Sequence, residues 1–443
     1  MTQNPSQSTI STVPTTAVRW KVVLLLMAMA FMCHFNRISM PVAGTAKIME
    51  QYDIDKVSMG MVYSCYLLIY TICMIPGGWL IDRYGAKFAL AAMGLGSAVF
   101  VFLTGSIGFL AAPALVLPAL LLVRSMTGLV SVPMHPGAAR VVASWLPRQS
   151  LARANGLVTA AALCGIAGTY YLFGMLIDRF GWPTAFMISG AVTLAIAFAW
   201  TFYATNSPAG HPRVSDAELR LIIGHLTDAP QSDNAATWYS LLGKRSLVLL
   251  TLSYSAVGYF QYLFFYWLEY YFKDFLKLDT DTGRLYATIP NLAMAAGMFL
   301  GGWVTDVLSR RVGARRGRAQ VAAGGLLAGT VFLGLGVFAH DPRWIVVWFS
   351  LAMGAVGMSE GPFWVTAIEL GGSQGGASAA IFNTGGNFGG ILAPVATPLL
   401  SNYLGWQGAL PVAGFFCLVG AALWFWIYPD ERLRLQMSPR VIG

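Results

Sequence analysis

Two apolar segments of the chain are joined by the stretch Gly78-Trp79-Leu80-Ile81-Asp82-Arg83-Tyr84-Gly85-Ala86-Lys87. A related stretch, Gly302-Trp303-Val304-Thr305-Asp306, follows a later apolar segment and runs into Arg310, Arg311 and Gly313. The two aspartates are 224 positions apart (306 − 82 = 224), and Gly181-Trp182 repeats at Gly405-Trp406 with the same offset. Two independent landmarks at one offset predict that the chain contains a duplicated unit.

The composition predicts an integral membrane protein. Of the 443 residues, 56% are hydrophobic and 11% are charged, whereas a soluble domain carries about 25% charged residues. Apolar runs long enough to cross about 30 Å of hydrocarbon recur along the sequence. We count twelve, centred near positions 33, 70, 98, 125, 165, 193, 258, 295, 329, 356, 388 and 418. We therefore expect an all-α membrane protein with twelve transmembrane helices in two pseudo-symmetric six-helix bundles.

The offset and the polar segments divide the chain into five expected parts. These are a disordered cytoplasmic tail at 1–17, a bundle at 18–205, a cytoplasmic linker at 206–244, a bundle at 245–430 and a second cytoplasmic tail at 431–443. The first tail is rich in Ser, Thr and Gln, which is typical of disorder. It is not a signal peptide, because the apolar segment after it is too long. In the linker, a short surface helix should begin near Ser215.

The net charge of +9 follows the expected topology and does not indicate a nucleic-acid partner. With the N-terminus inside, the 28 Lys and Arg residues divide into 19 on the cytoplasmic side, 7 outside, and Arg37 and Arg124 within the membrane. This excess of basic residues inside is what the positive-inside rule requires. Both termini should then be cytoplasmic.

No pattern in the sequence predicts an enzyme, a metal site or a cofactor. The histidines are scattered, and no nucleophile triad or phosphate-binding loop stands beside a strand and a helix. The cysteines have no metal-ligand spacing and all fall in apolar segments, as small core residues do. They are Cys33, Cys65, Cys73, Cys164 and Cys417.

The Gly-x-x-x-Asp-Arg-x-Gly-x-Lys pattern at 78–87 resembles the signature loop of the major facilitator superfamily. Its degenerate copy near 302 lies where that fold would place it. The resemblance implies that charged residues at these helix ends pair with one another and with helix termini, and so latch the two bundles in one conformation. They are Asp82, Arg83, Asp306 and Arg310.

A finer pattern resembles the anion:cation symporter family, which includes galactonate, glucarate and hexuronate transporters, sialin and the vesicular glutamate carriers. It consists of Asn36-Arg37, Tyr63, Tyr66, Tyr70, Pro76-Gly77-Gly78, Arg124, Gly128, Ser131, Pro133, Pro136, Trp145, Pro147, Arg153, Ala154-Asn155-Gly156, Pro362-Phe363-Trp364, Asn383, Gly386-Asn387, Gly389, Gly390 and Pro394. The resemblance implies a transporter of a small organic anion, such as a sugar acid, with its site between the bundles. We expect a monomer in the lipid bilayer of a bacterial inner membrane.

The chain departs from this family at two positions. Asn36 stands where the family usually has an acid beside the first-span arginine, and Ser131 stands where it usually has a glutamate. Both groups carry protons in such symporters, so coupling to H⁺, coupling to Na⁺ and uncoupled transport all stay open.

Two arginines in apolar segments are the predicted anion-binding groups. A charge at this depth costs about 2.5 to 3.5 kcal/mol on insertion scales, so it needs a partner or a cavity. The planar fork of arginine suits a carboxylate. Either Arg37 or Arg124 could instead pair with an acid inside the protein, and we favour anion binding more strongly for Arg37. The offset maps Arg37 onto Gln261, which should face it and bind substrate hydroxyls, unless it only joins two helices.

Other polar and aromatic residues complete the expected substrate site. Asn383 and Asn387 are i and i+4 on one helix face, which suits a polyol or a carboxylate, although they could instead satisfy nearby backbone groups. Tyr66 and Tyr70 could line the cavity or simply pack. Trp364 is the last expected contact.

Glu360 and His135 are the expected coupling pair. A carboxylate deep in a span must be paired or protonated, so Glu360 could carry a proton or serve as the counter-charge of an arginine. The offset places its equivalent at 136, beside His135. Glu269 and Glu369 lie nearer helix ends, where we expect them at the membrane interface.

Two other functions compete with anion transport. An exporter of drugs or hydrophobic solutes usually has a Gly-Pro motif in its fifth span, and the residues from Cys164 to Gly174 contain no proline. A transporter-like sensor would need a larger cytoplasmic surface than the linker offers.

Overall fold

The computed structural model describes residues 16–223 and 239–428, and this described part is helical without strands. The expected tails lie largely outside it, as does the middle of the linker. The first eight helices are α1 (Val18–Ala43), α2 (Met49–Gln51), α3 (Lys56–Ile72), α4 (Met74–Tyr84), α5 (Ala86–Ser106), α6 (Val116–Ser131), α7 (Met134–Trp145) and α8 (Arg148–Tyr203). The others are α9 (Asp216–Ile223), α10 (Tyr239–Leu242), α11 (Arg245–Tyr270), α12 (Thr280–Val312), α13 (Ala314–Phe338), α14 (Pro342–Met358), α15 (Glu360–Gly371) and α16 (Gly375–Leu423).

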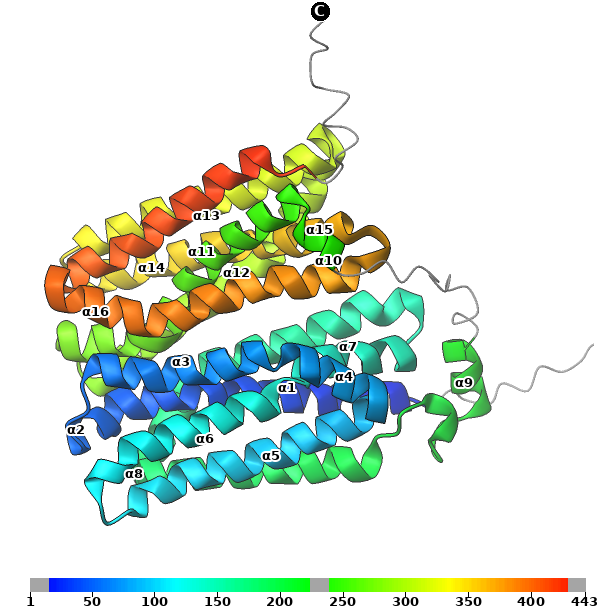
Figure 1. Ribbon diagram of the computed structural model, residues 1–443, viewed down its shortest axis with the longest axis horizontal. Coiled ribbons are helices and arrows are strands. Elements are labelled where there is room, and N and C mark those ends of the chain that lie inside the picture. Colours follow the sequence, from blue (N-terminus) through cyan, green and yellow to red (C-terminus); the bar gives the residue numbers. More distant parts are fainter. Residues whose placement is uncertain (1–15, 224–238, 429–443) are drawn as a thin grey trace, which may run out of the picture.

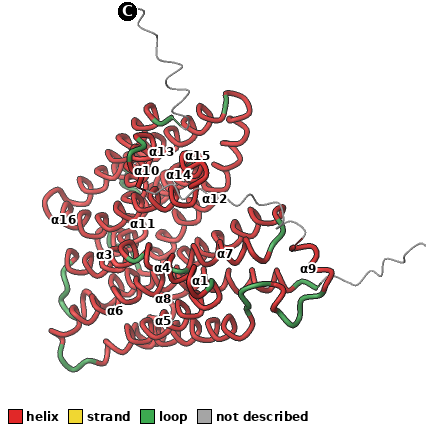
Figure 2. The backbone as a smooth tube through the Cα atoms, turned by 45° about the vertical axis from the view of Figure 1, so that its right-hand side comes forward, coloured by secondary structure: helices red, strands yellow, loops and turns green. Residues whose placement is uncertain are grey.

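The helices form two groups that lie one above the other in Figure 1. The N-terminal group comprises α1 to α8, in which α8 packs along α1 and α5. The C-terminal group comprises α11 to α16, in which α11 packs along α16 and α12 along α14. Figure 2 shows the same division after a turn of 45°, with loops confined to the ends of the helices.

Glycines with a left-handed backbone reverse the chain at matching points of the two groups. Gly181 (φ 78°) interrupts α8, and Gly405 (φ 67°) interrupts α16. Gly85 (φ 85°) separates α4 from α5, as Gly313 (φ 90°) separates α12 from α13. Such φ values strain any residue with a Cβ, so the sequence needs glycine at these turns. The repeated Gly-Trp landmarks therefore mark equivalent turns.

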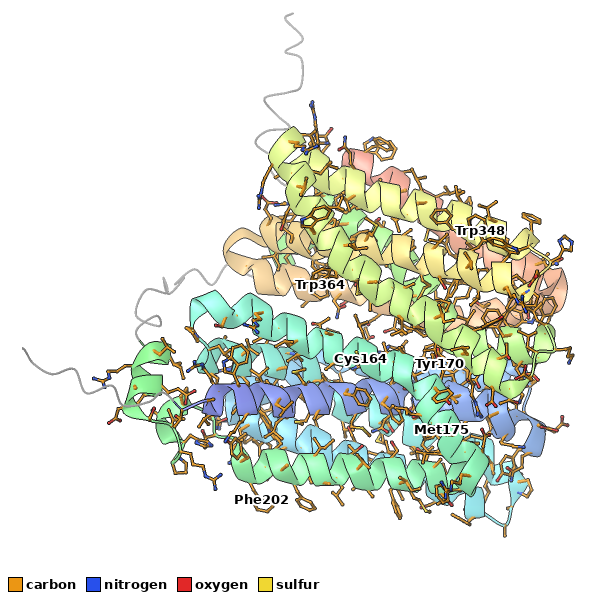
Figure 3. The ribbon with its side chains drawn as sticks, turned by 180° about the vertical axis from the view of Figure 1, so that it is seen from behind. Cys164, Tyr170, Met175, Phe202, Trp348 and Trp364 are labelled. Carbon is orange, nitrogen blue, oxygen red and sulfur yellow. The ribbon has the colours of Figure 1, made fainter. Side chains whose placement is uncertain are left out.

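The surface of the helices is suited to lipid. In the described part, nine helices are long and apolar enough to cross a membrane, or ten if the bent pair within residues 56–84 counts as one span. Large apolar side chains point outward, including Phe202 (83% exposed, labelled in Figure 3) and Phe299 (80% exposed). Side chains of this size are exposed at low cost only when hydrocarbon surrounds them.

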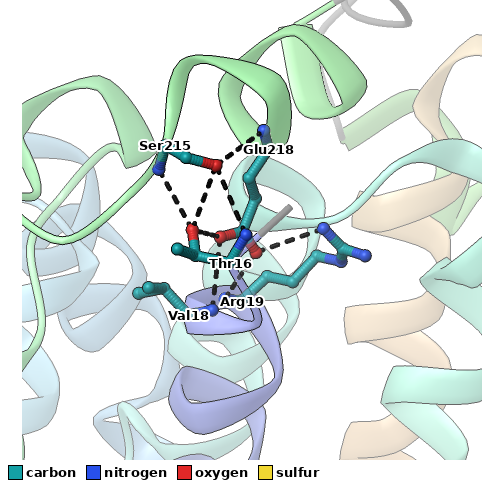
Figure 4. A network of polar contacts seen from close by, with 5 residues as sticks. All are labelled: Thr16, Val18, Arg19, Ser215 and Glu218. Carbon is teal, nitrogen blue, oxygen red and sulfur yellow. Dashed lines mark hydrogen bonds and ion pairs between the residues drawn. The ribbon is translucent and has the colours of Figure 1, made fainter. Parts of the chain in front are cut away.

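The linker helix α9 is attached to the start of α1 by the buried carboxylate of Glu218, shown in Figure 4. Its oxygens accept hydrogen bonds from the backbone N–H groups of Val18 (3.3 Å) and Arg19 (3.1 Å), and from the Thr16 hydroxyl (2.5 Å). A carboxylate here satisfies N–H groups that have no partner within the helix and also meets the positive end of its dipole. The expected helix near Ser215 is confirmed, but no feature of the sequence indicated that Glu218 would be buried.

The two groups meet mainly at one end of the molecule. We name the end that holds Gly85 and α9 the linker end, and the end that holds Gly181 and Gly405 the opposite end. At the opposite end, the Lys273 ammonium donates to the Thr45 carbonyl (3.3 Å) and the Lys56 ammonium to the Ser401 hydroxyl (3.3 Å). Figure 3 shows the ribbons of the two groups diverging from this end toward the linker end.

Candidate functional site

Arg37 of α1 reaches from the N-terminal group to the C-terminal group. Its guanidinium donates to the Tyr262 hydroxyl of α11 and lies 4.7 Å from the centre of that ring and 5.3 Å from the centre of the Tyr66 ring. Its Nε has no partner, and no carboxylate of the described residues forms an ion pair with it. Arg37 thus presents a positive charge between the groups that only a neutral hydroxyl and aromatic rings offset.

The predicted partner of Arg37 was wrong by one residue. Gln261 is buried, but its amide donates to the Glu360 carboxylate, while the neighbouring Tyr262 meets Arg37. Consecutive residues of an α-helix point about 100° apart, since a turn has 3.6 residues. A sequence offset finds the correct turn of α11 but not the direction of each side chain.

Arg124 forms hydrogen bonds with the backbone of α1. Its side chain is buried, and its terminal nitrogens donate to the carbonyl oxygens of Asn36 (3.3 Å) and Arg37 (3.0 Å). The Arg37 carbonyl lacks its usual donor because the residue four positions on is Pro41, which has no N–H. The structure therefore favours the internal role for Arg124 that the sequence left open, although its partners are carbonyls and not an acid.

Asn36 and Arg37 face in different directions. The Asn36 amide donates to the Thr193 hydroxyl (2.8 Å) and accepts from the Ser189 hydroxyl (2.5 Å), both in the second half of α8. This neutral network lies inside the N-terminal group and is fully hydrogen-bonded. Asn36 is thus a packing residue of the N-terminal group, whereas Arg37 is available to the interface.

Glu360 begins α15 and is surrounded by neutral donors. One oxygen accepts from the Gln261 amide (2.5 Å), and the other accepts from the Tyr254 hydroxyl (2.9 Å) and the Trp364 indole (3.2 Å). No lysine or arginine of the described residues forms an ion pair with it. The alternative that Glu360 is the fixed counter-charge of Arg37 or Arg124 is therefore wrong for this conformation.

The two expected coupling residues are not brought together. His135 is exposed at the start of α7, and its ring lies 5.2 Å from the ring of His34, whose Nδ1 is 3.0 Å from the Ala30 carbonyl oxygen. Glu360 meets residues of the C-terminal group only. Repeat-related positions occupy equivalent places in the two groups, and equivalence does not imply contact.

The remaining expected substrate residues lie around the interface between the groups. The Tyr66 and Tyr70 rings are buried and stack with their centres 6.4 Å apart. Asn387 is buried and donates to the Met74 sulfur (3.4 Å) of the other group, while Asn383 is partly buried. Trp364 is 37% exposed and lies on the side of its group that faces the N-terminal group (Figure 3).

The charged residues of the signature loops do not join the two groups in this conformation. Asp82 pairs with Arg140 of α7, within the N-terminal group, and not with the neighbouring Arg83. Arg83 and Arg140 line a surface cavity of about 350 Å³ at the linker end. Asp306 and Arg310 are exposed, and neither forms an ion pair with a described residue.

Sequence reasoning missed several residues that the structure places in or near the site. Tyr254 and Tyr262 belong to an unusually aromatic α11, and that density was the one available signal. Glu269 lies one residue before the end of α11, near a helix end as expected, but it is 3% exposed, while Glu369 is partly exposed and pairs with Arg318. Among the described residues, no cluster of three or more His, Cys, Asp or Glu side chains could hold a metal ion.

A family model for the Major Facilitator Superfamily matches residues 25–380. The chain is 29% identical to a probable galactarate/D-glucarate transporter of Bacillus subtilis, with 90% of this chain and 89% of the relative covered. It is 27% identical to a D-galactonate transporter of Escherichia coli, with 94% and 96% covered. A probable sulfoacetate transporter of Cupriavidus necator is also 27% identical, with 93% and 94% covered.

Solved structures show the same fold. A bacterial homologue of the human lysosomal transporter Spinster, crystallised in an inward-facing and unoccupied conformation, superposes with a TM-score of 0.76. The alignment covers 96% of this chain and 99% of that one at 15% identity. At this identity the likeness concerns the fold alone.

Proposed function

Because the chain belongs to the major facilitator superfamily, we propose that it moves a small organic anion, a sugar acid or a related carboxylate, across a membrane by alternating access. The observation that carries the proposal is Arg37, a guanidinium between the two groups with a neutral hydroxyl as its hydrogen-bond partner. The relatives are named as transporters of galactarate, glucarate, galactonate and sulfoacetate, and these names support the same class of substrate.

A carboxylate is the ligand that best satisfies Arg37. The arginine donates to Tyr262, and its Nε has no partner, so the guanidinium retains donors for a ligand. A planar fork with free N–H groups binds a carboxylate through two parallel hydrogen bonds. Arg124 donates hydrogen bonds to the carbonyl oxygens of Asn36 and Arg37 in α1, and so fixes the position of the Arg37 guanidinium.

The other residues around the interface suit the hydroxyl groups of a sugar acid. We assign Gln261, Asn383 and Asn387 to hydroxyl and carboxylate contacts, because amides both donate and accept. Tyr66, Tyr70 and Trp364 would form the walls of the site. Trp364 already donates to Glu360, so movement of this ring would change both the site and the carboxylate.

We propose twelve membrane crossings, with the bundles at 18–205 and 245–430 as the moving units. Each of the long helices α8 and α16 would cross twice and turn at its glycine, which adds two crossings to the ten that apolar length supports. The excess of lysine and arginine on one side would place both termini and the 206–244 linker in the cytoplasm of a bacterium. The linker end would then be cytoplasmic.

The coupling ion would be a proton bound at Glu360. Three neutral groups donate hydrogen bonds to the Glu360 carboxylate, and no cation of the described residues pairs with it. Binding of a proton would therefore remove an uncompensated negative charge from the site. His135, exposed beside His34, would be a second proton-binding group. Sodium-linked and uncoupled transport are the alternatives.

The charged residues of the signature loops would latch the two groups in the conformation that closes the linker end. They are Asp82, Arg83, Asp306 and Arg310.

Counterflow in proteoliposomes tests the proposed substrate class. Vesicles containing the purified chain are loaded with unlabelled sugar acid and diluted into labelled sugar acid, sulfonate or cationic dye. We expect exchange of carboxylates, abolished by Arg37→Ala and unchanged by Arg343→Ala, an exposed arginine at the opposite end. Exchange of dyes without carboxylates would support an exporter, and binding without exchange would support a sensor.

A further inference from the structure

A second charged cluster joins the two groups at the opposite end. Arg284 of α12 is 2% exposed, and both of its terminal nitrogens donate to the Asp178 carboxylate of α8, one of them at 3.0 Å. Its Nε lies 3.6 Å from the Glu269 carboxylate of α11, beyond hydrogen-bond distance. One guanidinium therefore stands between a carboxylate of its own group and a carboxylate of the other group.

Glu269 lacks the hydrogen bonds that a buried carboxylate needs. It is 3% exposed, and neither of its oxygens accepts a hydrogen bond from any described residue. An ionised carboxylate in such a place is costly, whereas the protonated form is neutral and can also donate a hydrogen bond. In this conformation, Asp178 holds both terminal nitrogens of Arg284, and only the Nε of Arg284, 3.6 Å away, faces Glu269.

Of the cations around Glu269, Arg284 is the one that can pair with the ionised carboxylate. The Lys273 ammonium is already directed to the carbonyls of Thr45 (3.3 Å) and Ala46 (3.4 Å) in the π-helical turn Gly44–Ile48 that follows α1. The ionisable groups near Glu269 are Arg284 of α12, Lys273 and Asp274 of the π-helical turn Tyr271–Phe275, Tyr63 of α3, Tyr170 and Asp178 of α8, and Tyr266 of α11 itself.

We propose that Glu269 and Asp178 compete for Arg284, and that a proton on Glu269 closes the opposite end of the carrier. When the groups separate there, Asp178 leaves with α8, and Arg284 turns to the ionised Glu269 of its own group. When they close, Glu269 binds one proton and Arg284 transfers to Asp178. The proton comes from the aqueous phase at the opposite end and returns to it, so it regulates the gate and is not transported.

Acid at the opposite end should therefore favour closure. A single proton-binding site changes the ratio of closed to open molecules by up to about tenfold per pH unit. The inference rests on the proposed alternating access, but its readout is a distance and not a flux. A failure of counterflow would therefore contradict the proposed transport, whereas an unchanged distance would contradict the gate.

Distance measurements on the full chain in lipid nanodiscs test the gate. Spin labels on non-canonical residues at Phe109 (67% exposed) and Tyr403 (81% exposed) report the separation of the groups at the opposite end, and leave the native cysteines in place. In the wild type, the short-distance population should grow as the pH falls. In Glu269→Gln, which imitates the protonated form, it should stay high at every pH.

Three further variants make the outcome decisive. Glu369→Gln removes a partly exposed carboxylate elsewhere and should keep the wild-type pH dependence. Asp178→Asn removes the negative charge in α8 that attracts Arg284 and should lower the closed population at every pH. If Glu269→Gln does not fold, Glu269→Asp serves instead and should shift the midpoint of the pH dependence. A wild-type pH dependence in both Glu269 variants, or an unchanged closed population in Asp178→Asn, would overturn the proposal.

Discussion

Two arginines, the buried Arg284 and the partly buried Arg37, connect the same two groups of helices and differ in their partners. Arg284 gives both terminal nitrogens to the Asp178 carboxylate and has a second carboxylate beside it. Arg37 donates to the hydroxyl of Tyr262 and is flanked by aromatic rings. A buried charge with its own counter-charge is structural or part of a gate, whereas one with only neutral partners can bind a charged ligand. This difference assigns the two arginines separate tasks.

The largest effect should come from changing the shape of the cation at the substrate site. Arg37→Lys keeps the positive charge but loses the planar fork and its paired hydrogen bonds. Hydrogen bonds to charged groups contribute about 1.5 to 3 kcal/mol, so we expect kcat/KM for sugar-acid uptake to fall by about 10- to 100-fold. Arg343→Lys is the matched control. Equal uptake by the two variants would show that Arg37 does not bind the substrate.

Removal of the central carboxylate should abolish proton-driven accumulation. Glu360→Gln keeps a side chain of the same shape but cannot change its charge, so uptake against a gradient should lose its response to an applied pH difference. One coupled proton supports about tenfold accumulation per pH unit, and this is the amount expected to be lost while counterflow continues. Accumulation that persists in Glu360→Gln and disappears in His135→Ala would place the proton at the histidine pair.

A smaller effect should follow when the neutral partner of Arg37 is removed. Tyr262→Phe deletes the hydroxyl that now accepts a hydrogen bond from the guanidinium. A substrate carboxylate then has no competitor, and we expect the Kd measured by calorimetry to fall by about 2- to 5-fold, as for the loss of one hydrogen bond worth about 0.5 to 1 kcal/mol. Weaker binding would show that the hydroxyl contacts the substrate.

The smallest effect should appear where a polar residue only packs. Asn36→Ala removes the partner of the Ser189 and Thr193 hydroxyls inside the N-terminal group. Interhelical hydrogen bonds in membranes contribute about 0.6 kcal/mol each, so thermal unfolding should shift by a few degrees while KM stays unchanged. A large rise in KM would mean that Asn36 also faces the substrate.

The sequence predicted the fold more completely than the site. Apolar runs and an offset of 224 suffice to recognise the helices and the repeat, because both depend on local composition. The site depends on which way each side chain points. Gln261 and Tyr262 differ by about 100° in direction, and this decides which of them meets Arg37.

Other features of the site depended on the packing of distant helices. Glu269 lies near the end of α11, and only the approach of α12 and α8 shows that it is buried beside a shared arginine. The role of Arg124 was partly visible in the sequence. Pro41 leaves the Arg37 carbonyl without a helical donor, so a neighbouring donor was required.

The two glycine turns also have a consequence for how the protein is made. At Gly181 and Gly405 two helices meet at a single glycine where the chain reverses, so no separate loop joins the two limbs of α8 or of α16. The insertion machinery would receive each pair as a single helical hairpin, with both limbs entering the bilayer together. A bulky residue at either glycine should therefore reduce the yield of inserted protein during synthesis, before transport can be affected.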